Sequence, residues 1–174
     1  LDDKEFRSWT RSAIYHNAIQ CLTAFIQGGL TQNDAPDIAQ CMTAAAMKEN
    51  PAFVERLLMA GVSSNIEHID TTYAPTLYKS RPLHWAMHVA TAQTLLAAGA
   101  KINARNQHGK PPVGTLLERL NMHQGPQEKD VKASQALSQT VCHLIDQGCQ
   151  LELPGKKGQW HAWQIWDSLD RHDV

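Results

Sequence analysis

A short apolar pattern recurs four times along the 174 residues: two adjacent apolar residues, two spacers and then a glycine. The copies are Phe25-Ile26 with Gly29, Leu57-Leu58 with Gly61, Leu95-Leu96 with Gly99, and Leu144-Ile145 with Gly148. An asparagine follows the glycine by four positions in three copies (Asn33, Asn65 and Asn103), whereas the fourth has Glu152 there. Such recurrence predicts a supersecondary unit stacked on copies of itself, an architecture that usually binds other proteins.

The second copy belongs to a predicted pair of helices. Residues 37–48 are rich in Ala and Met and predict one helix, and Pro51 suits the first turn of the next helix. Apolar residues then recur at helical spacing, at Phe53, Val54, Leu57 and Leu58. We expect Gly61 to take the left-handed conformation that ends this helix. We expect Asn65 to bond its side chain to nearby backbone in the turn that follows.

The third unit carries the most specific string, RPLHWA at residues 81–86 followed by TLLAAGAKINAR at residues 94–105. It resembles the ankyrin repeat, whose signature is T-P-L-H-x-A on the first helix and L-L-x-x-G-A-x-x-N-A after the second. Arg81 replaces the usual Thr, and the fourth unit has Gly114 in place of the signature His. The resemblance implies that His84 bonds neighbouring turn backbone. The segment after His84 is about two residues shorter than in the family, which predicts a shortened turn between the helices.

The resemblance implies an all-α fold: an ankyrin-repeat solenoid of four to five stacked helix-turn-helix units with degenerate terminal caps. Residues 1–174 would form a single domain, with units at 1–34 (N-terminal cap), 35–70, 71–108, 109–154 and 155–174 (C-terminal cap). The glycines of successive copies are 32, 38 and 49 residues apart, against about 33 in a regular array. The excess predicts two inserted loops, at residues 66–79 and 121–132.

Composition narrows the function classes. The formal net charge is −1, so we expect no overall attraction to nucleic acid or anionic lipid. No apolar run reaches about 18 residues, which predicts no membrane-spanning segment. The chain begins at Leu1, which favours a removed leader or a trimmed sequence and leaves bacterial periplasm and cytoplasm both open as compartments. The four cysteines (Cys21, Cys41, Cys142 and Cys149) are expected to be free and buried, although a Cys21–Cys41 disulfide stays open.

Enzymatic chemistry finds little support in the sequence. The nucleophile elbow, the phosphate-binding loop and the dinucleotide-binding loop are all absent as motifs, so we expect no catalytic residues and no cofactor. His84 and His88 lie four positions apart on one expected helix and could present two imidazoles to zinc. No third ligand lies nearby in the sequence and H-E-x-x-H is absent, so we predict no metal site.

Two aromatic segments have open roles. Trp160, Trp163 and Trp166 form a stripe that we expect to seal the last unit of the stack, although one of them could anchor a partner. The insertion at residues 66–79 carries Tyr73, Leu77 and Tyr78. It is either a surface loop packed against the stack or an enlarged finger that contacts a partner, and both interpretations stay open.

The contact positions usual in the family, carried over to the matching residues, imply a protein-binding surface. They flank the turn glycine or end the first helix of a unit, and with Tyr73 of the insertion they are Met47, Lys48, Tyr73, Leu77, Tyr78, Ser80, His88, Val89, Gln107, His108 and Lys110.

The resemblance therefore implies a non-catalytic module that binds a specific protein. By analogy with small free-standing ankyrin proteins of bacterial type, it would be an inhibitor or immunity protein that neutralises a partner such as a toxic enzyme. One alternative is the targeting domain of a secreted effector that binds a host protein. A less favoured alternative is a small metal-dependent hydrolase.

Overall fold

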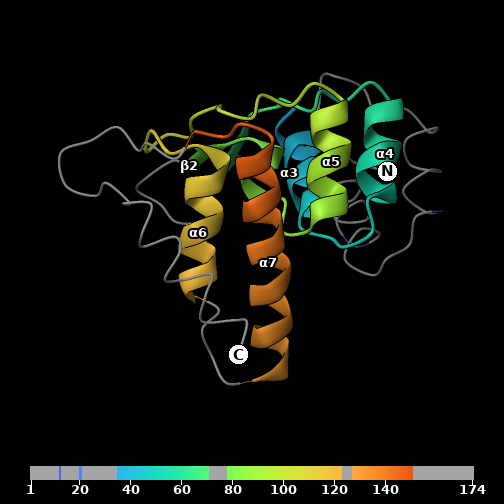
Figure 1. The fold of residues 1–174 in the computed structure, drawn as a ribbon. Helices are drawn as coiled ribbons and strands as arrows, with labels where there is room; N and C mark the ends of the chain where they lie inside the picture. The colour runs from blue at the N-terminus through green and yellow to red at the C-terminus, as the bar shows by residue number, and fades with distance from the viewer. Residues whose placement is uncertain (1–11, 13–19, 21–34, 71–77, 123–126, 151–174) are drawn as a thin grey trace.

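The computed structural model describes residues 35–70, 78–122 and 127–150, together with the isolated positions 12 and 20. The predicted terminal caps, the tryptophan stripe, Tyr73 and Leu77 lie outside the described residues, as does Cys21. The described helices and strands are, in chain order, α3 (Ala35–Ala46), α4 (Ala52–Met59), β1 (His68–Asp70), β2 (Tyr78–Ser80), the 3-10 helix η2 (Pro82–Trp85), α5 (Val89–Ala97), α6 (Pro112–Met122) and α7 (Glu128–Asp146). This helix-rich architecture agrees with the predicted all-α class (Figure 1).

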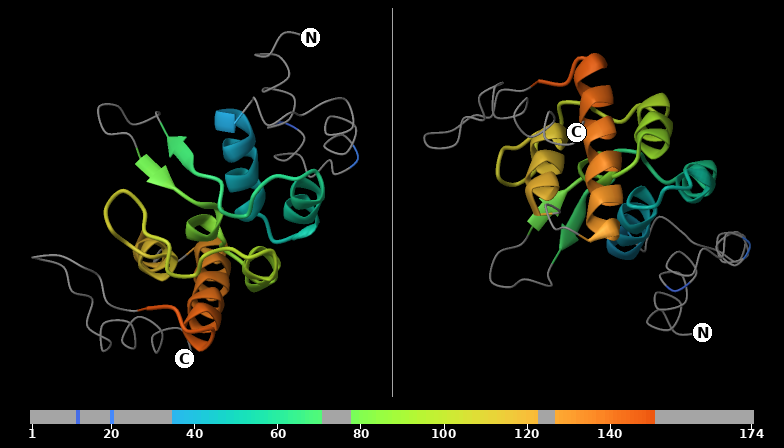
Figure 2. Two further views of the ribbon diagram at one scale, coloured as in Figure 1. Left: turned by 90° about the horizontal axis from the view of Figure 1, so that it is seen from above. Right: turned by 60° about the horizontal axis from the view of Figure 1, so that its bottom comes forward.

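The described helices form three consecutive pairs. The first members, α3, η2 and α6, contact one another in one row, and the second members, α4, α5 and α7, contact one another in a second row (Figure 2). Within each pair the two members also contact each other. The predicted helix at residues 37–48 is confirmed as α3, and Pro51 lies at the N-cap of α4, next to its expected position.

Three turn glycines end the second helix of their pairs in the same way. Gly61 has φ 87°, its N–H donates to Leu58 O over 2.9 Å, and the N–H of Val62 donates to Leu57 O over 3.0 Å. Gly99 and Gly148 repeat this pair of hydrogen bonds, with φ values of 80° and 87°. This is the Schellman cap, which needs a residue at positive φ. The predicted role of Gly61 is confirmed.

The first helix of the third unit is a single 3-10 turn. It ends at Trp85, and Ala86 is extended with ψ 94°, so the chain leaves the helical conformation before α5 begins at Val89. The missing residues therefore shorten the helix rather than the turn. The prediction that His84 and His88 share a helix is wrong, because His84 lies in η2 and His88 is the N-cap of α5.

The two predicted insertions have different structures. In the described part of the first insertion, β1 and β2 pair as the antiparallel strands of a β-hairpin, with Ile69 opposite Lys79 and His68 opposite Ser80, which follows the predicted range. The second expected loop is largely helical, because α6 continues to Met122 and α7 begins at Glu128. The extra residues there lengthen the last helix pair, which extends beyond α4 and α5 in Figure 1.

One apolar core joins the three pairs. Its largest fully buried apolar side chains are Phe53, Met42, Leu57, Leu83, Leu95, Leu116, Leu120, Leu137 and Leu144. Cys41 and Cys149 are buried as expected, whereas Cys142 is exposed, because it lies on the solvent side of α7. Within the described residues, no helix is both long and apolar enough to cross a membrane.

Candidate protein-binding surface

The described members of the predicted surface fall into two groups at opposite ends of the helices. Met47, Lys48, His88 and Val89 lie where the first helix of a unit gives way to the second. Tyr78, Ser80, Gln107, His108 and Lys110 lie near the hairpin and the loop that follows α5. Since α5 has nine residues, about 13 Å of helix separates its two ends. The structure therefore brings each group together but not the two groups.

The loop after α5 pairs with the hairpin. The N–H of Gln107 donates to Lys79 O over 3.0 Å, and the N–H of Lys79 donates to Oε1 of Gln107 over 3.2 Å. The loop itself is folded by Asn106, whose Oδ1 accepts the N–H groups of His108 (2.9 Å) and Lys110 (3.0 Å). We call this loop (residues 101–111) and the described part of the hairpin (residues 66–70 and 78–80) the two fingers.

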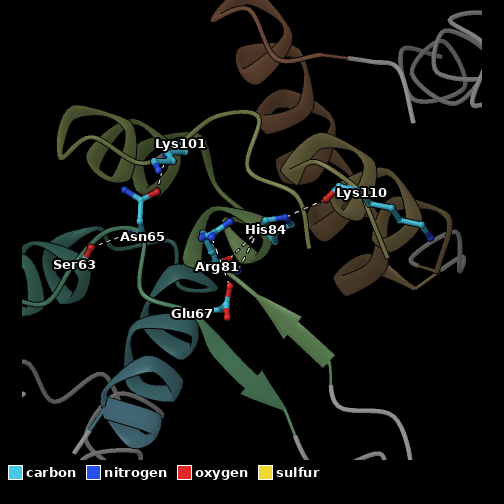
Figure 3. A network of polar contacts seen from close by, with 7 residues as sticks. All are labelled: Ser63, Asn65, Glu67, Arg81, His84, Lys101 and Lys110. Carbon is cyan, nitrogen blue, oxygen red and sulfur yellow. Dashed lines mark hydrogen bonds and ion pairs between the residues drawn. The ribbon is translucent and has the colours of Figure 1, made fainter. Parts of the chain in front are cut away.

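His84 connects the base of both fingers. Its side chain is fully buried, Nε2–H donates to Lys110 O over 3.2 Å, and Nδ1 accepts the Arg81 N–H over 3.3 Å (Figure 3). Burial lowers the pKa of His84 to about 4, although backbone hydrogen bonds oppose that shift. The imidazole is therefore neutral at physiological pH, with one nitrogen donating and the other accepting. The expected bonding of His84 to turn backbone is confirmed, and neither ring nitrogen is left to bind a metal.

Asn65 links neighbouring units rather than closing its own turn. Its Oδ1 accepts the Lys101 N–H over 2.8 Å (Figure 3). Its Nδ2–H donates to Gly99 O over 2.8 Å. Asn103 makes the equivalent acceptor contact with the next unit, because its Oδ1 accepts the Gln150 N–H over 2.7 Å. The predicted local bond of Asn65 is wrong, because its side chain spans more than thirty residues of sequence to reach the next glycine turn.

Ser80 differs from the other predicted contact residues. It is 1% exposed, and its hydroxyl oxygen accepts the indole N–H of Trp85 over 2.6 Å. The guanidinium of Arg119 lies 3.8 Å from the Trp85 ring centroid. Ser80 therefore supports Trp85 instead of offering exposed surface. The sequence pattern did not predict the pairing of Trp85 with Arg119, although Trp85 immediately follows the signature His84.

The other group of predicted contact residues, at the opposite end of the helices, is less polar. Met47 is 38% exposed, while Lys48, His88 and Val89 are half-buried. Burial lowers the pKa of His88, and the nearby carboxylate of Glu49 partly opposes this. Among the described residues, no three His, Cys, Asp or Glu side chains are grouped closely enough to hold a metal ion.

Part of this region is similar to a known protein family. Residues 80–107 match the model of the ankyrin repeat, a segment that runs from the end of β2 through η2 and α5 to Gln107. No curated protein matches the chain. The chain therefore contains an ankyrin repeat at residues 80–107.

Proposed function

We propose that the chain is a non-catalytic, protein-binding ankyrin module that acts as an inhibitor or immunity-type protein. It binds one specific partner protein, such as a toxic enzyme, and neutralises it. The observation that carries the proposal is the ankyrin repeat at residues 80–107, because ankyrin repeats bind protein partners. On this proposal, residues 1–174 are one solenoid domain of four to five units, capped by residues 1–34 and 155–174.

The two fingers are the proposed contact region. Gln107 and His108 are exposed at the second finger, and the backbone beneath them is held by Lys79, Asn106 and His84. A loop held in its binding conformation loses little conformational entropy when a partner docks. Tyr78 and Lys110 lie on the same fingers and belong to the proposed surface, whereas buried Ser80 supports it from beneath.

Inhibition is the simplest action available to such a module. A stack that binds without reacting changes its partner by covering, blocking or positioning it. Covering an active site needs only a complementary surface with a few well-packed anchors.

The test is affinity capture from cells of the source organism with the tagged chain, followed by mass spectrometry and by titration of the purified partner. We expect one stoichiometric partner, whose activity falls to zero near one equivalent of the chain. A partner that keeps full activity when saturated would overturn the inhibitory role and leave the binding role standing. The absence of any stoichiometric partner would overturn both.

A matched pair of variants locates the contact. Gln107→Glu with His108→Glu should weaken partner binding, because both positions are exposed on the second finger. Glu55→Lys, on the exposed side of α4, is the control and should bind as the original chain does. Equal affinity in all three proteins would show that the partner docks elsewhere.

A further inference from the structure

Charge is distributed unevenly along the chain. Residues 66–111 contain five basic and two acidic residues, whereas the rest of the chain contains eleven basic and fifteen acidic residues. The five basic residues are Lys79, Arg81, Lys101, Arg105 and Lys110, and all of them lie on or beside the two fingers. The fingers are therefore positive although the whole chain has a net charge of −1.

Ion pairs neutralise two of these five cations. Arg81 lies 3.5 Å from Glu67, and Lys110 pairs with Glu118 of α6. Across the described residues, no ion pair involves Lys79, Lys101 or Arg105, and all three side chains are exposed. Arg105 donates from Nη1 to Gly109 O over 2.7 Å, which orients its guanidinium without neutralising it.

The hairpin register places one of these three cations, Lys79, on a defined side of the first finger. Ile69 and Lys79 are directly opposite each other, so their side chains lie on the same side of the hairpin. The next opposed pair, His68 and Ser80, lies on the other side and is buried. Gln107 bonds to Lys79 from the second finger. An exposed row therefore runs across the fingers from Ile69, which is 44% exposed, through Lys79 to Gln107.

We propose that the exposed side chains Ile69, Lys79, Lys101, Arg105 and Gln107 of the two fingers, here called the basic finger face, bind an acidic segment of the partner protein. The inference rests on the proposed function and specifies the chemistry of its partner. Carboxylates would pair with the three uncompensated cations, and an apolar side chain among them would contact Ile69. Complementary charge of this kind speeds association and rejects partners of the wrong charge.

The same charges fit a nucleic acid less well. Proteins that bind the phosphate backbone commonly neutralise about 6–10 phosphates, whereas this face offers three uncompensated cations. The exposed isoleucine at one end of the row, Ile69, favours a protein contact instead.

The test measures binding of three labelled probes to the full chain by fluorescence anisotropy. The probes are a short peptide of alternating Glu and Leu, the same peptide with Gln in place of Glu, and a short single-stranded DNA. We expect the Glu peptide alone to bind, with an affinity that falls as salt is added. The double variant K79E/K101E should weaken its binding roughly tenfold. Among the described residues, neither of these side chains has a hydrogen bond or ion pair, so their charge can be reversed without removing a described contact.

Arg56→Glu is the matched control, because it reverses one exposed cation on α4, outside the fingers. It should leave the affinity for the Glu peptide unchanged. The inference is overturned if the Glu peptide does not bind, if K79E/K101E binds it as tightly as the original chain, or if the DNA binds more tightly than the peptide. A captured partner that binds K79E/K101E at full affinity would also overturn it while leaving the proposed function intact.

Discussion

The hydroxyl of Thr91, at the start of α5, donates a 2.8 Å hydrogen bond to the carbonyl oxygen of Lys48, in the turn between α3 and α4. Thr140 of α7 repeats this contact with Met87 O over 3.2 Å. In both units the threonine stands eight positions before the turn glycine. Because Asn65 and Asn103 join the units at the glycine turns, successive units are bonded at both ends of their helices.

Replacing Thr91 with Val should lower the free energy of unfolding by about 1–2 kcal/mol, because it removes the hydrogen bond from the buried Thr91 hydroxyl to the Lys48 carbonyl. Urea unfolding followed by circular dichroism measures the change. Thr94→Val is the control on the same helix, since Thr94 bonds only to Ala90 O of its own helix among the described contacts. We expect the control to change the free energy by about 0.5 kcal/mol or less. Equal losses in the two variants would contradict a role in joining units.

Gly99→Ala should destabilise the fold through backbone conformation alone. Gly99 has φ 80°, and a Cβ placed there would meet no atom within 4 Å. The left-handed conformation is unfavourable for alanine by about 1–2 kcal/mol. Gly99→Asn should lose less, because asparagine tolerates this conformation better. Chemical unfolding of both variants checks the order, and an alanine variant as stable as the asparagine variant would contradict it.

The sequence predicted the glycine caps because the cap is local: the glycine and its bonding partners lie within five residues of one another. It could not predict the partners of Asn65, since these depend on how the next unit is placed alongside. The same reason explains why Trp85 and Arg119 were missed, as their contact joins residues from different units. Insertion length was evident at both sites, but length alone does not distinguish a hairpin from two lengthened helices.

Asn65→Ala should loosen the contact between the second and third units. It removes the acceptor of the Lys101 N–H and the donor to Gly99 O, which together should lower the free energy of unfolding by about 1–3 kcal/mol. Hydrogen exchange of the Lys101 amide should become faster. Asn65→Asp keeps an acceptor for Lys101 but loses the donor, so Lys101 should stay more protected than in the alanine variant. Unchanged exchange in both variants would contradict the proposed link.

Stability should fall in mild acid because His84 must be neutral when folded. Its pKa is about 4 in the folded chain against 6.5 for an ordinary histidine, so the unfolded state binds the proton first as pH decreases. The stabilisation is fully present above about pH 6.5 and is lost as pH falls to about 4, by about 3 kcal/mol at most. Urea unfolding across this range measures it. His84→Gln should have a smaller pH dependence over the same window, and parallel curves for the two proteins would contradict the assignment.

The Trp85–Arg119 contact should contribute measurably because both side chains are partly shielded from solvent and the guanidinium lies over the indole ring. Trp85→Phe keeps an aromatic ring but removes the donor to Ser80, and Arg119→Lys keeps the charge but removes the planar group that stacks. A double-mutant cycle on the free energy of unfolding isolates the pair itself. We expect a coupling of about 0.5–1 kcal/mol, typical of cation–π pairs near the surface. Strict additivity of the two single substitutions would show that the stacking contributes nothing to stability.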